Sequence, residues 1–394
     1  MFNQTIAVIT ILAALLIVYH HAIYPVFLNW LGKRKRNQRS TTLLAAEENS
    51  LNTDILPSIT IVIPAYNEAN YIADKIRNTG ALDYPTDRLK VIVVMDGCSD
   101  DTAAIAKKTA AEIECEHLNL EIIDHQQNRG KVAILNETIS QTDTNIVALS
   151  DVSALVSIDA MYKLAERFAD PDTGVVSSNY HLLNPGSEGE AVYWRYQRNI
   201  KHNEAAIGGL LGAHGAFYAF RRELFQPFEA DTINDDFILP MRIMAKGYQG
   251  HYAGDINALE LENATQQMDS PRRKRIAAGN IQQLIRLRAL LSPYRKGIAF
   301  TFASGKALRV IMPWLMLIAL VGSIWLSFTS LLFLSAAIIQ MAVYSIALSV
   351  HIGGIEKCHK ISRAIYYLVL GHLSNLIGTL DYLRNKRKSW KLDS

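Results

Sequence analysis

The chain has 394 residues, a formal net charge of +3 and 49% hydrophobic residues, which is enough for one large or two medium domains with a buried core. This small net charge gives no indication of a nucleic-acid partner. The three cysteines, Cys98, Cys115 and Cys358, have no paired spacing, which excludes a disulfide scaffold and a cysteine-based zinc module.

The first apolar stretch runs from Thr5 to Leu31 and is almost uncharged. A membrane-spanning helix needs about 20 apolar residues, so this stretch can cross a bilayer. A signal peptide would begin with positive charge, whereas the basic residues Lys33 to Arg39 come after the apolar stretch. We therefore predict an uncleaved transmembrane anchor over residues 1–36 with its carboxyl end in the cytoplasm, followed by a polar linker over 37–57.

The segment after the linker predicts a β-α-β unit. Ile59 to Ile63 and Val91 to Met95 are short, almost wholly apolar and bounded by turn signals, as expected for strands that are buried on both faces. Between them, Asn70 to Asn78 has helical spacing. This succession implies a parallel sheet with a right-handed crossover, in which ligands bind beyond the carboxyl ends of the strands. The residues just past those ends are Tyr66, Asn67, Glu68, Asp96, Ser99 and Asp100.

The alternation of strands and helices continues beyond this unit, which predicts an α/β domain with a mostly parallel sheet. We expect further strands at 120–124, 145–150 and 174–179, and helices at 101–115, 130–142 and 159–168. Beyond Pro185 the pattern changes. It becomes a long helix over 188–207, a glycine-rich segment over 208–215 and a helix over 236–246.

A basic stretch from Arg272 to Arg288 carries apolar residues at helical spacing. These properties predict an interfacial amphipathic helix within a region 271–300, and the alternative is a basic linker between the domain and the membrane.

Two further apolar stretches, Val310 to Phe328 and Leu331 to Val350, are separated by a short pause and predict a hairpin across the membrane. The segment from Ala364 to Leu383 contains His372, Asn375 and Asp381. If it crossed, the basic residues after it would lie outside, against the usual charge distribution. We therefore predict three crossings and an interfacial or re-entrant fourth segment.

Carboxylates recur at the predicted strand ends. They are Asp96, Asp124, Asp151 and the pair Asp235–Asp236. Such an edge suits a hydroxyl-rich ligand and a cation such as Mg²⁺ or Mn²⁺, which prefer oxygen ligands. Lys131 follows a glycine at a predicted helix start, where it can meet a diphosphate. Each carboxylate alone could instead be a solvated loop residue or a helix cap, but their succession favours a site.

Three common motifs are missing from the sequence. It contains no G-x-x-x-x-G-K-S/T, no G-x-G-x-x-G after the first strand and no G-x-S-x-G. These absences disfavour a P-loop nucleotide hydrolase, a dinucleotide site and a nucleophile elbow.

The motifs resemble those of the membrane-associated family 2 glycosyltransferases, which have the GT-A fold. The resemblance covers the chain from about Ser58 to Leu291. It rests on the order and spacing of I-P-A-Y-N-E, V-M-D-G-C-S-D-D-T, N-R-G-K-V-A-I-L-N, L-S-D, G-A-H-G-A-F, I-N-D-D-F-I-L-P and A-G-N-I-Q-Q-L. The implied organisation is an anchor over 1–36, a linker over 37–57, a cytoplasmic GT-A domain over 58–270, interfacial helices over 271–300, and a membrane region over 301–394 with the hairpin 310–350 and the segment 364–383.

The resemblance also implies a role for each matching residue. Asp236 would be the catalytic base, with Asp235 beside it in the acidic pair. Asp151 would hold the divalent metal, Mg²⁺ or Mn²⁺. The implied nucleotide-binding residues are Ala65, Tyr66, Glu68, Asp96, Lys131 and Asp151. The implied residues on the acceptor side and in the closing motif are His214, Gly215, Gln283 and Arg286.

Two departures from the family pattern are visible. The D-x-D metal motif reads Asp151-Val152-Ser153, and serine is a weaker metal ligand than a carboxylate. The Q-x-x-R-W motif of processive synthases ends in Leu287 in place of tryptophan. The second departure weakens a comparison with cellulose or hyaluronan synthases, which thread a polymer through the membrane.

The resemblance therefore implies a multi-pass protein of the cytoplasmic (inner) membrane with a cytoplasmic catalytic domain. Its expected reaction is the inverting, metal-dependent transfer of a sugar from a nucleotide sugar, UDP-linked in most relatives, to a lipid-linked or growing cell-surface saccharide. One alternative is a processive poly-N-acetylglucosamine or hyaluronan-like synthase. Another, from a different class, is a catalytically silent scaffold of a polysaccharide-assembly complex. The implied partners are a nucleotide-sugar donor, a lipid-linked or polysaccharide acceptor, the bilayer and further assembly subunits, with no nucleic acid.

Overall fold

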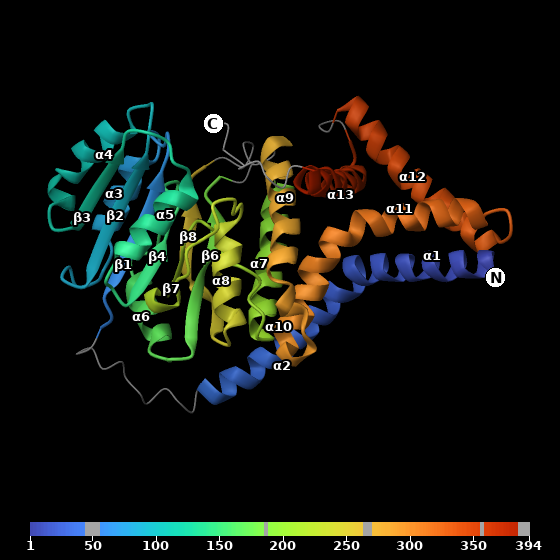
Figure 1. Ribbon diagram of the computed structural model, residues 1–394, viewed down its shortest axis with the longest axis horizontal. Helices are drawn as coiled ribbons and strands as arrows, with labels where there is room; N and C mark the ends of the chain where they lie inside the picture. The colour runs from blue at the N-terminus through green and yellow to red at the C-terminus, as the bar shows by residue number, and fades with distance from the viewer. Residues whose placement is uncertain (44–55, 185–187, 263–269, 355–357, 385–394) are drawn as a thin grey trace. The chain divides into compact units, whose positions relative to one another are not determined.

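A computed structural model describes residues 1–43, 56–184, 188–262, 270–354 and 358–384, and within these only the backbone of 36–43, 188–193 and 270–273 (Figure 1). Much of the predicted linker 37–57 and the end of the predicted C-terminal region, 385–394, therefore lie outside the described residues. By their internal contacts, the described residues form two compact units. The first contains 1–27, 270–286, 301–354 and 358–384, and the second contains 28–43, 56–184, 188–262 and 287–300.

The second unit is built on an eight-stranded mixed sheet with the strand order β3-β2-β1-β4-β7-β6-β8-β5. The strands are β1 (Ile59–Ala65), β2 (Leu89–Asp96), β3 (Asn119–His125), β4 (Ile146–Leu149), β5 (Ala154–Val156), β6 (Thr173–Leu182), β7 (Tyr218–Arg221) and β8 (Gln249–Glu260).

One half of this sheet, β3-β2-β1-β4, is parallel throughout, as the sequence predicts. The register pairs Ala65 with Met95 and Asp96 with His125, so the carboxyl ends of β1, β2 and β3 lie at one edge. Strands β1, β2 and β4 are buried along almost their whole length, which explains their continuous apolar sequence.

The other half, β7-β6-β8-β5, is mixed, and three of its strands were not predicted. Strand β7 is antiparallel to β4 and β6, and β5 is antiparallel to β8, while β6 and β8 are parallel. Strands β5 and β7 are too short to give a periodic signal. Strand β8 alternates buried and exposed residues irregularly, because its register against β6 shifts after Ala253.

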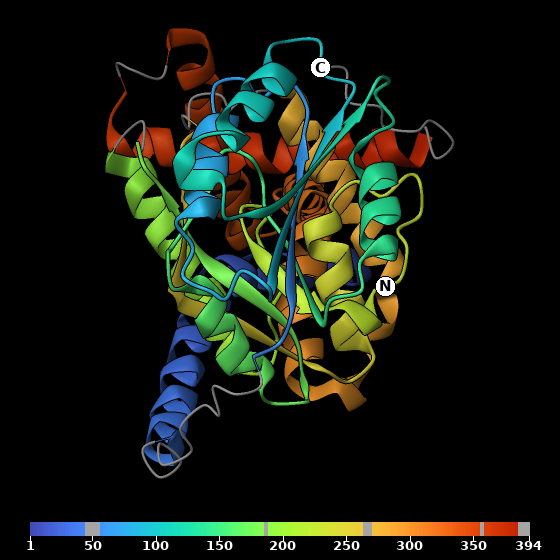
Figure 2. The same cartoon turned by 90° about the vertical axis from the view of Figure 1, so that its left-hand side faces the viewer.

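Helices cover both faces of the sheet. They are α3 (Ile72–Gly80), α4 (Thr102–Ala110), α5 (Lys131–Gln141), α6 (Ala160–Phe168), α7 (Glu188–Ala206) and α8 (Asp235–Ala245). Helices α3 and α6 share one core with the odd-numbered residues of β1 and β2, and α5 and α8 lie on the opposite side of the strands (Figure 2). Short 3₁₀ turns occur at Ile113–Cys115, Arg222–Leu224, Arg288–Leu291 and Pro293–Arg295.

The first unit consists of long helices. They are α1 (Phe2–Val18), α9 (Ser270–Arg286), α11 (Leu308–Leu326), α12 (Leu331–Gly353) and α13 (Lys360–Arg384). A π-helical turn at Tyr19–Ile23 joins α1 to α2 (Tyr24–Leu43), so the helix enters the segment predicted as linker. A second π-helical turn at Phe302–Ala307 joins α10 (Lys296–Thr301) to α11.

Three helices among the described residues are long and apolar enough to cross a membrane. They span Phe2–Lys35, Pro293–Leu326 and Leu331–Gly353, in agreement with the three predicted crossings. Helix α13 is continuous but is not among them. Small residues allow close helix packing in this unit: a Cβ at Gly322 in α11 would meet Thr10 Oγ1 of α1 at 1.9 Å.

Candidate active site

Asp151, the first residue of the predicted metal motif, follows the end of β4. Its backbone N–H donates to Gly215 O at 3.2 Å. Its Oδ2 lies so close to Gly215 that a Cβ there would be 2.7 Å away, so any larger residue would displace the carboxylate. The Asp151 side chain is nevertheless 37% exposed, which leaves it accessible to a ligand.

Lys131, the first residue of α5, lies between two carboxylates. Its Nζ is 3.1 Å from Asp151 Oδ1 and 3.7 Å from Asp235 Oδ2. Burial alone would lower the pKa of Lys131, but the charges of Asp151 and then Asp235 raise it above the usual range for lysine. Burial also opposes ionisation of Asp151, yet Lys131 holds the pKa of that carboxyl below its ordinary value. The pair is therefore fully ionised at neutral pH.

The acidic pair stands at the start of helix α8. Asp235 is 7% exposed, and its Oδ2 has no hydrogen-bond partner among the described residues. Asp236 is half-buried. Burial, and then the like charge of Asp235, raise the pKa of Asp236 to about 6. A carboxylate whose pKa lies this close to neutral is a suitable proton acceptor at the pH of a cell.

The predicted nucleotide residues Ala65, Tyr66 and Glu68 lie at and just past the end of β1. Ala65 is buried, while Tyr66 and Glu68 are half-buried. The Glu68 backbone N–H donates to Thr102 Oγ1 at 2.8 Å. Burial, and then the charge of Asp151, raise the pKa of Glu68 to about 7. Glu68 and Asp151 are therefore close enough to influence each other's charge.

Asp96, the last residue of β2, is 3% exposed. Its Oδ1 accepts a hydrogen bond from the Arg129 N–H (2.8 Å), and its Oδ2 accepts one from the Gly130 N–H (2.7 Å). The carboxylate thus fixes the loop that leads into α5 and presents Lys131. Its predicted contact with the nucleotide remains a prediction, and the geometry gives it a second role in holding this loop.

On the predicted acceptor side, His214 stacks on Tyr180 of β6, with ring centroids 3.7 Å apart and 21° between the planes. Trp194 of α7 meets the same Tyr180 at 4.8 Å. Gly215 follows His214 and adjoins Asp151, so the segment 214–215 connects this aromatic group to the candidate metal ligand. The sequence reasoning identified His214 but missed Tyr180, because a tyrosine within a strand has the pattern of a core residue.

The closing-motif residues Gln283 and Arg286 belong to α9 in the first unit. Gln283 is 1% exposed, and neither end of its amide has a hydrogen-bond partner among the described residues. Their predicted role at the nucleotide remains a prediction.

The sequence reasoning missed Glu260, at the end of β8. Glu260 of β8 pairs with Ala154 of the neighbouring strand β5 and is 5% exposed. Burial raises the pKa of its carboxyl, against a hydrogen bond from Ser153 that lowers it. Ser153, which replaces the second aspartate of the D-x-D motif, thus donates a hydrogen bond to a carboxylate from another strand.

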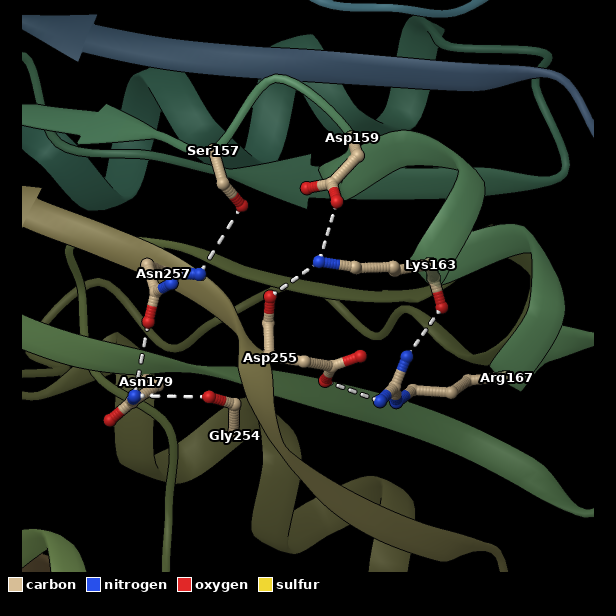
Figure 3. Close-up of polar contacts among 8 residues, drawn as sticks. All are labelled: Ser157, Asp159, Lys163, Arg167, Asn179, Gly254, Asp255 and Asn257. Atoms are coloured by element: carbon tan, nitrogen blue, oxygen red, sulfur yellow. Dashed lines mark hydrogen bonds and ion pairs between the residues drawn. The ribbon is translucent and has the colours of Figure 1, made fainter.

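A bulge in β8 brings Glu260 to this place. Ser178 pairs with Ala253 but Asn179 pairs with Asn257, so the residues between have no partner on β6. Lys163 and Arg167 of α6 bond to Asp255 in this bulge, at 2.8 Å to its carbonyl oxygen and 2.5 Å to its carboxylate (Figure 3). The side-chain amide of Asn179 donates to Gly254 O at 3.1 Å (Figure 3). Bulges re-aim the residues that follow them, which here form the short pairing with β5.

The residues present fit a divalent ion held by one protein carboxylate. Within the described residues, no three His, Cys, Asp or Glu side chains are grouped so that they could hold a metal ion. Mg²⁺ commonly takes only one or two protein carboxylates and completes its octahedron with water and substrate phosphates. Asp151 has the exposure for this role, and the space beside its Oδ2 exists because residue 215 has no Cβ.

The fold is shared with a solved glycosyltransferase. The mannosyltransferase PcManGT of Pyrobaculum calidifontis, solved in complex with GDP-Man and Mn²⁺, superposes with a TM-score of 0.70 over 94% of this chain and 99% of that one, at 22% identity. This likeness confirms the predicted GT-A fold.

Two curated proteins are similar to this chain in sequence over about half of its length. The poly-beta-1,6-N-acetyl-D-glucosamine synthase of Staphylococcus aureus (strain MSSA476) is 30% identical over 210 residues, which cover 51% of this chain and 49% of that protein. The synthase of the same name from Staphylococcus epidermidis is 26% identical over 202 residues, covering 49% of this chain and 47% of that protein. The chain thus spans about half the length of these curated relatives.

The family profile named Glycosyl transferase family 2 matches residues 60–228. The match begins within β1, includes Lys131, Asp151 and Gly215, and ends before Asp235. The stretch 60–228, which carries Asp151 and Lys131, therefore matches glycosyl transferase family 2.

Proposed function

We propose that this protein is a membrane-associated inverting glycosyltransferase that moves a sugar from a UDP-linked nucleotide sugar to a lipid-linked or cell-surface saccharide. The observation that carries the proposal is the ammonium of Lys131 between Asp151 and Asp235, with Asp236 beside them. This arrangement combines a cation for a diphosphate, a ligand for a divalent ion and a base with a raised pKa.

The donor half of the reaction uses residues at the parallel strand ends. Tyr66 and Glu68 lie where the base and ribose of a nucleotide would bind at such an edge, and Asp96 fixes the loop before Lys131. Lys131, at the start of α5, is suited to receive the diphosphate as a point charge next to backbone N–H groups. A divalent ion held by Asp151 would supply further charge stabilisation to the leaving diphosphate.

The acceptor half uses Asp236. A sugar hydroxyl is a weak nucleophile until a base removes its proton, and the raised pKa of Asp236 suits that task near neutral pH. The oxygen then forms a bond to the anomeric carbon while the bond to the diphosphate breaks on the opposite face, so the configuration inverts. The ring of His214, stacked on Tyr180, offers a flat surface beside Asp151 for the acceptor.

The three apolar helices support a location in a membrane, and the membrane we propose is the cytoplasmic one. The basic residues that follow the first span favour a cytoplasmic catalytic domain, where nucleotide sugars are available.

A processive synthase is the second candidate. It is favoured by the 30% identity to the S. aureus poly-beta-1,6-N-acetyl-D-glucosamine synthase over half of the chain. Leu287 stands where processive synthases have tryptophan, which favours addition of one or a few sugars. The length of the labelled product decides between them: a ladder of long polymers would establish the synthase.

The proposal is tested by incubating membranes that contain the full chain with radiolabelled UDP- and GDP-sugars and Mn²⁺. We expect transfer of label from one of the UDP-sugars to a lipid or polysaccharide fraction. Asp236→Asn should reduce this transfer at least about 10³-fold while membrane insertion and UDP binding persist, because the base is lost and the donor site is not.

Asp87→Asn is the matched control, since Asp87 is an exposed residue in a surface ion pair with Arg88 and should leave activity unchanged. Binding of UDP with Mn²⁺ but no transfer from any donor by the wild type would favour the silent scaffold. Unchanged turnover in Asp236→Asn would refute the base assignment.

A further inference from the structure

Helix α3 carries a lysine that the reaction outlined above does not use. Lys75 is 1% exposed and is among the largest fully buried side chains in the protein. Lysine is almost never buried to this extent without a partner. Ile72 and Ile76, one turn away or less on the same helix, are fully buried and apolar, so packing alone would be met by another apolar residue at position 75.

The ammonium of Lys75 is bound from two sides. Its Nζ donates to Ser150 Oγ at 2.6 Å and to Ala154 O at 2.5 Å. These two acceptors flank the segment Asp151–Ser153, which contains the candidate metal ligand. Lys75 of α3 therefore binds the residues at both ends of that segment.

The contact continues to the other side of Asp151. The Ser150 hydroxyl, which accepts from Lys75, donates to Ala216 O at 2.7 Å. Ala216 follows Gly215, whose missing Cβ makes room for Asp151 Oδ2 and whose carbonyl accepts the Asp151 N–H. One buried chain of hydrogen bonds thus joins α3, the residue after β4 and Ala216, which is next to the glycine that borders the carboxylate.

The charge of Lys75 is also directed at this segment. Burial lowers the pKa of Lys75 to about 7, but the charges of Asp151 and Glu260 act in the opposite sense. Lys75 in turn helps to keep the pKa of Asp151 low, after the larger contribution of Lys131. In its protonated form Lys75 is therefore a second cation near Asp151, in addition to Lys131.

We propose that Lys75 is a positioning residue of the donor site, which holds Asp151 in the place and orientation that a nucleotide diphosphate and its metal ion require. This inference rests on the proposed function. It assigns donor affinity, rather than the proton transfer at Asp236, to the contact between Lys75 and Ser150. A purely structural lysine would affect unfolding and leave the kinetics of the folded protein unchanged.

The test compares Lys75→Met with wild type in the full-length protein purified in detergent. Methionine has a similar length and no charge, so it fills the same space without the two hydrogen bonds. We expect the Kd for UDP with Mn²⁺, from calorimetry, and the KM for the donor sugar nucleotide to rise at least tenfold. We expect kcat at saturating donor to fall less than threefold, because Asp236 is unchanged.

Two further variants complete the experiment. Ser150→Ala removes one of the two acceptors and should raise the same Kd about threefold to tenfold, even if Lys75→Met fails to fold. Lys107→Met is the matched control, because Lys107 forms an exposed ion pair with Asp124 and should change neither constant.

Wild-type donor affinity in folded Lys75→Met, or in Ser150→Ala where Lys75→Met does not fold, would overturn the inference. So would a loss confined to kcat. Failure of the proposed function has a different signature, since wild-type protein would then transfer no sugar from any donor.

Discussion

The carboxylate at the end of β2 and the carboxylates around Lys131 are bound in different ways. At the end of β2, each carboxylate oxygen of Asp96 accepts a hydrogen bond from a backbone N–H, one from Arg129 and one from Gly130. After β4 and at the start of α8, Asp151 and Asp235 face the ammonium of Lys131, and Asp235 Oδ2 has no hydrogen-bond partner among the described residues. A carboxylate bound by the backbone supports a fixed loop, whereas one that faces a side-chain cation is free to exchange that cation for a ligand.

This difference teaches which carboxylates serve the fold and which serve the reaction. Carboxylates that are hydrogen-bonded by the backbone, such as Asp96, stabilise the folded state and are less available to react or to bind a ligand. Partly satisfied, charged groups cost stability and are retained where a ligand completes them. The comparison predicts that changes at Lys131 and Asp236 affect catalysis, while changes at Asp96 affect stability as well.

The largest expected effect comes from Lys131→Met. Without the ammonium, Asp151 and Asp235 would face each other and the diphosphate without a neutralising cation. We expect kcat/KM for the donor to fall about 10³-fold, in the range measured when one stabilising group is removed from a transition state. Steady-state kinetics on purified protein gives the ratio. Lys90→Met, which removes a surface ion pair with Glu121, is the control, and a loss below tenfold in Lys131→Met would contradict the comparison.

The pH dependence of kcat/KM gives the next largest effect. Because burial and Asp235 raise the pKa of Asp236 to about 6, and the base must be deprotonated, activity should be full above this pH and fall about tenfold per unit below it. Asp235→Asn removes the like charge, so the acid limb should move to lower pH. A limb that stays in place in Asp235→Asn would assign the titration to another group, such as Glu68, which Glu68→Gln would reveal.

Asp96→Asn tests the other half of the comparison. One amide oxygen can accept from Arg129 or Gly130, but the amide N–H₂ would then face the second backbone N–H, so two donors would meet in a buried place. We expect a loss of about 2–3 kcal/mol in the free energy of unfolding and a higher donor KM, because the loop before Lys131 loosens. Denaturant unfolding measures the first quantity. Asp124→Asn, at a surface ion pair, should cost less than about 0.5 kcal/mol, and an equal loss in both variants would remove the distinction.

The two halves of the sheet, β3-β2-β1-β4 and β7-β6-β8-β5, differ in how well the sequence predicts them. Strands β1, β2 and β4 are buried runs of apolar residues, so their pattern identifies them, and the polar residues after them follow at the carboxyl edge. The GT-A fold and the three apolar spans could be predicted from motif order and hydropathy, and both predictions are confirmed.

What could not be predicted depends on tertiary contacts. The bulge after Ala253 is bound by α6 and Asn179, and it shifts the register of the residues that lead to Glu260. Lys75 stands in a helix whose charged neighbours are exposed, so nothing local distinguishes it from a solvated lysine. Such residues can be identified only when the segment that they contact is known.

The smallest expected effect is at Glu68. This residue follows β1, and burial together with the charge of Asp151 raises the pKa of its carboxyl. Burial, and then Asp151, raise its pKa to about 7, so the folded state favours the protonated carboxyl. The stabilisation by the protonated form is present below the pKa of the unfolded chain and is lost as pH rises through 7. Glu68→Gln keeps a neutral side chain at every pH and should therefore be more stable than wild type at pH 8, by about 1–2 kcal/mol after allowance for partial exposure, and equal at pH 4.5.

Thermal unfolding at the two pH values measures the difference in this variant, with the exposed Glu116→Gln as control. If Glu68→Gln also raises the donor KM, the destabilising carboxyl of Glu68 serves nucleotide binding. The end of β1 then contributes to the reaction as well as to the fold. If stability and KM are both unchanged at pH 8, Glu68 is an ordinary solvated carboxylate.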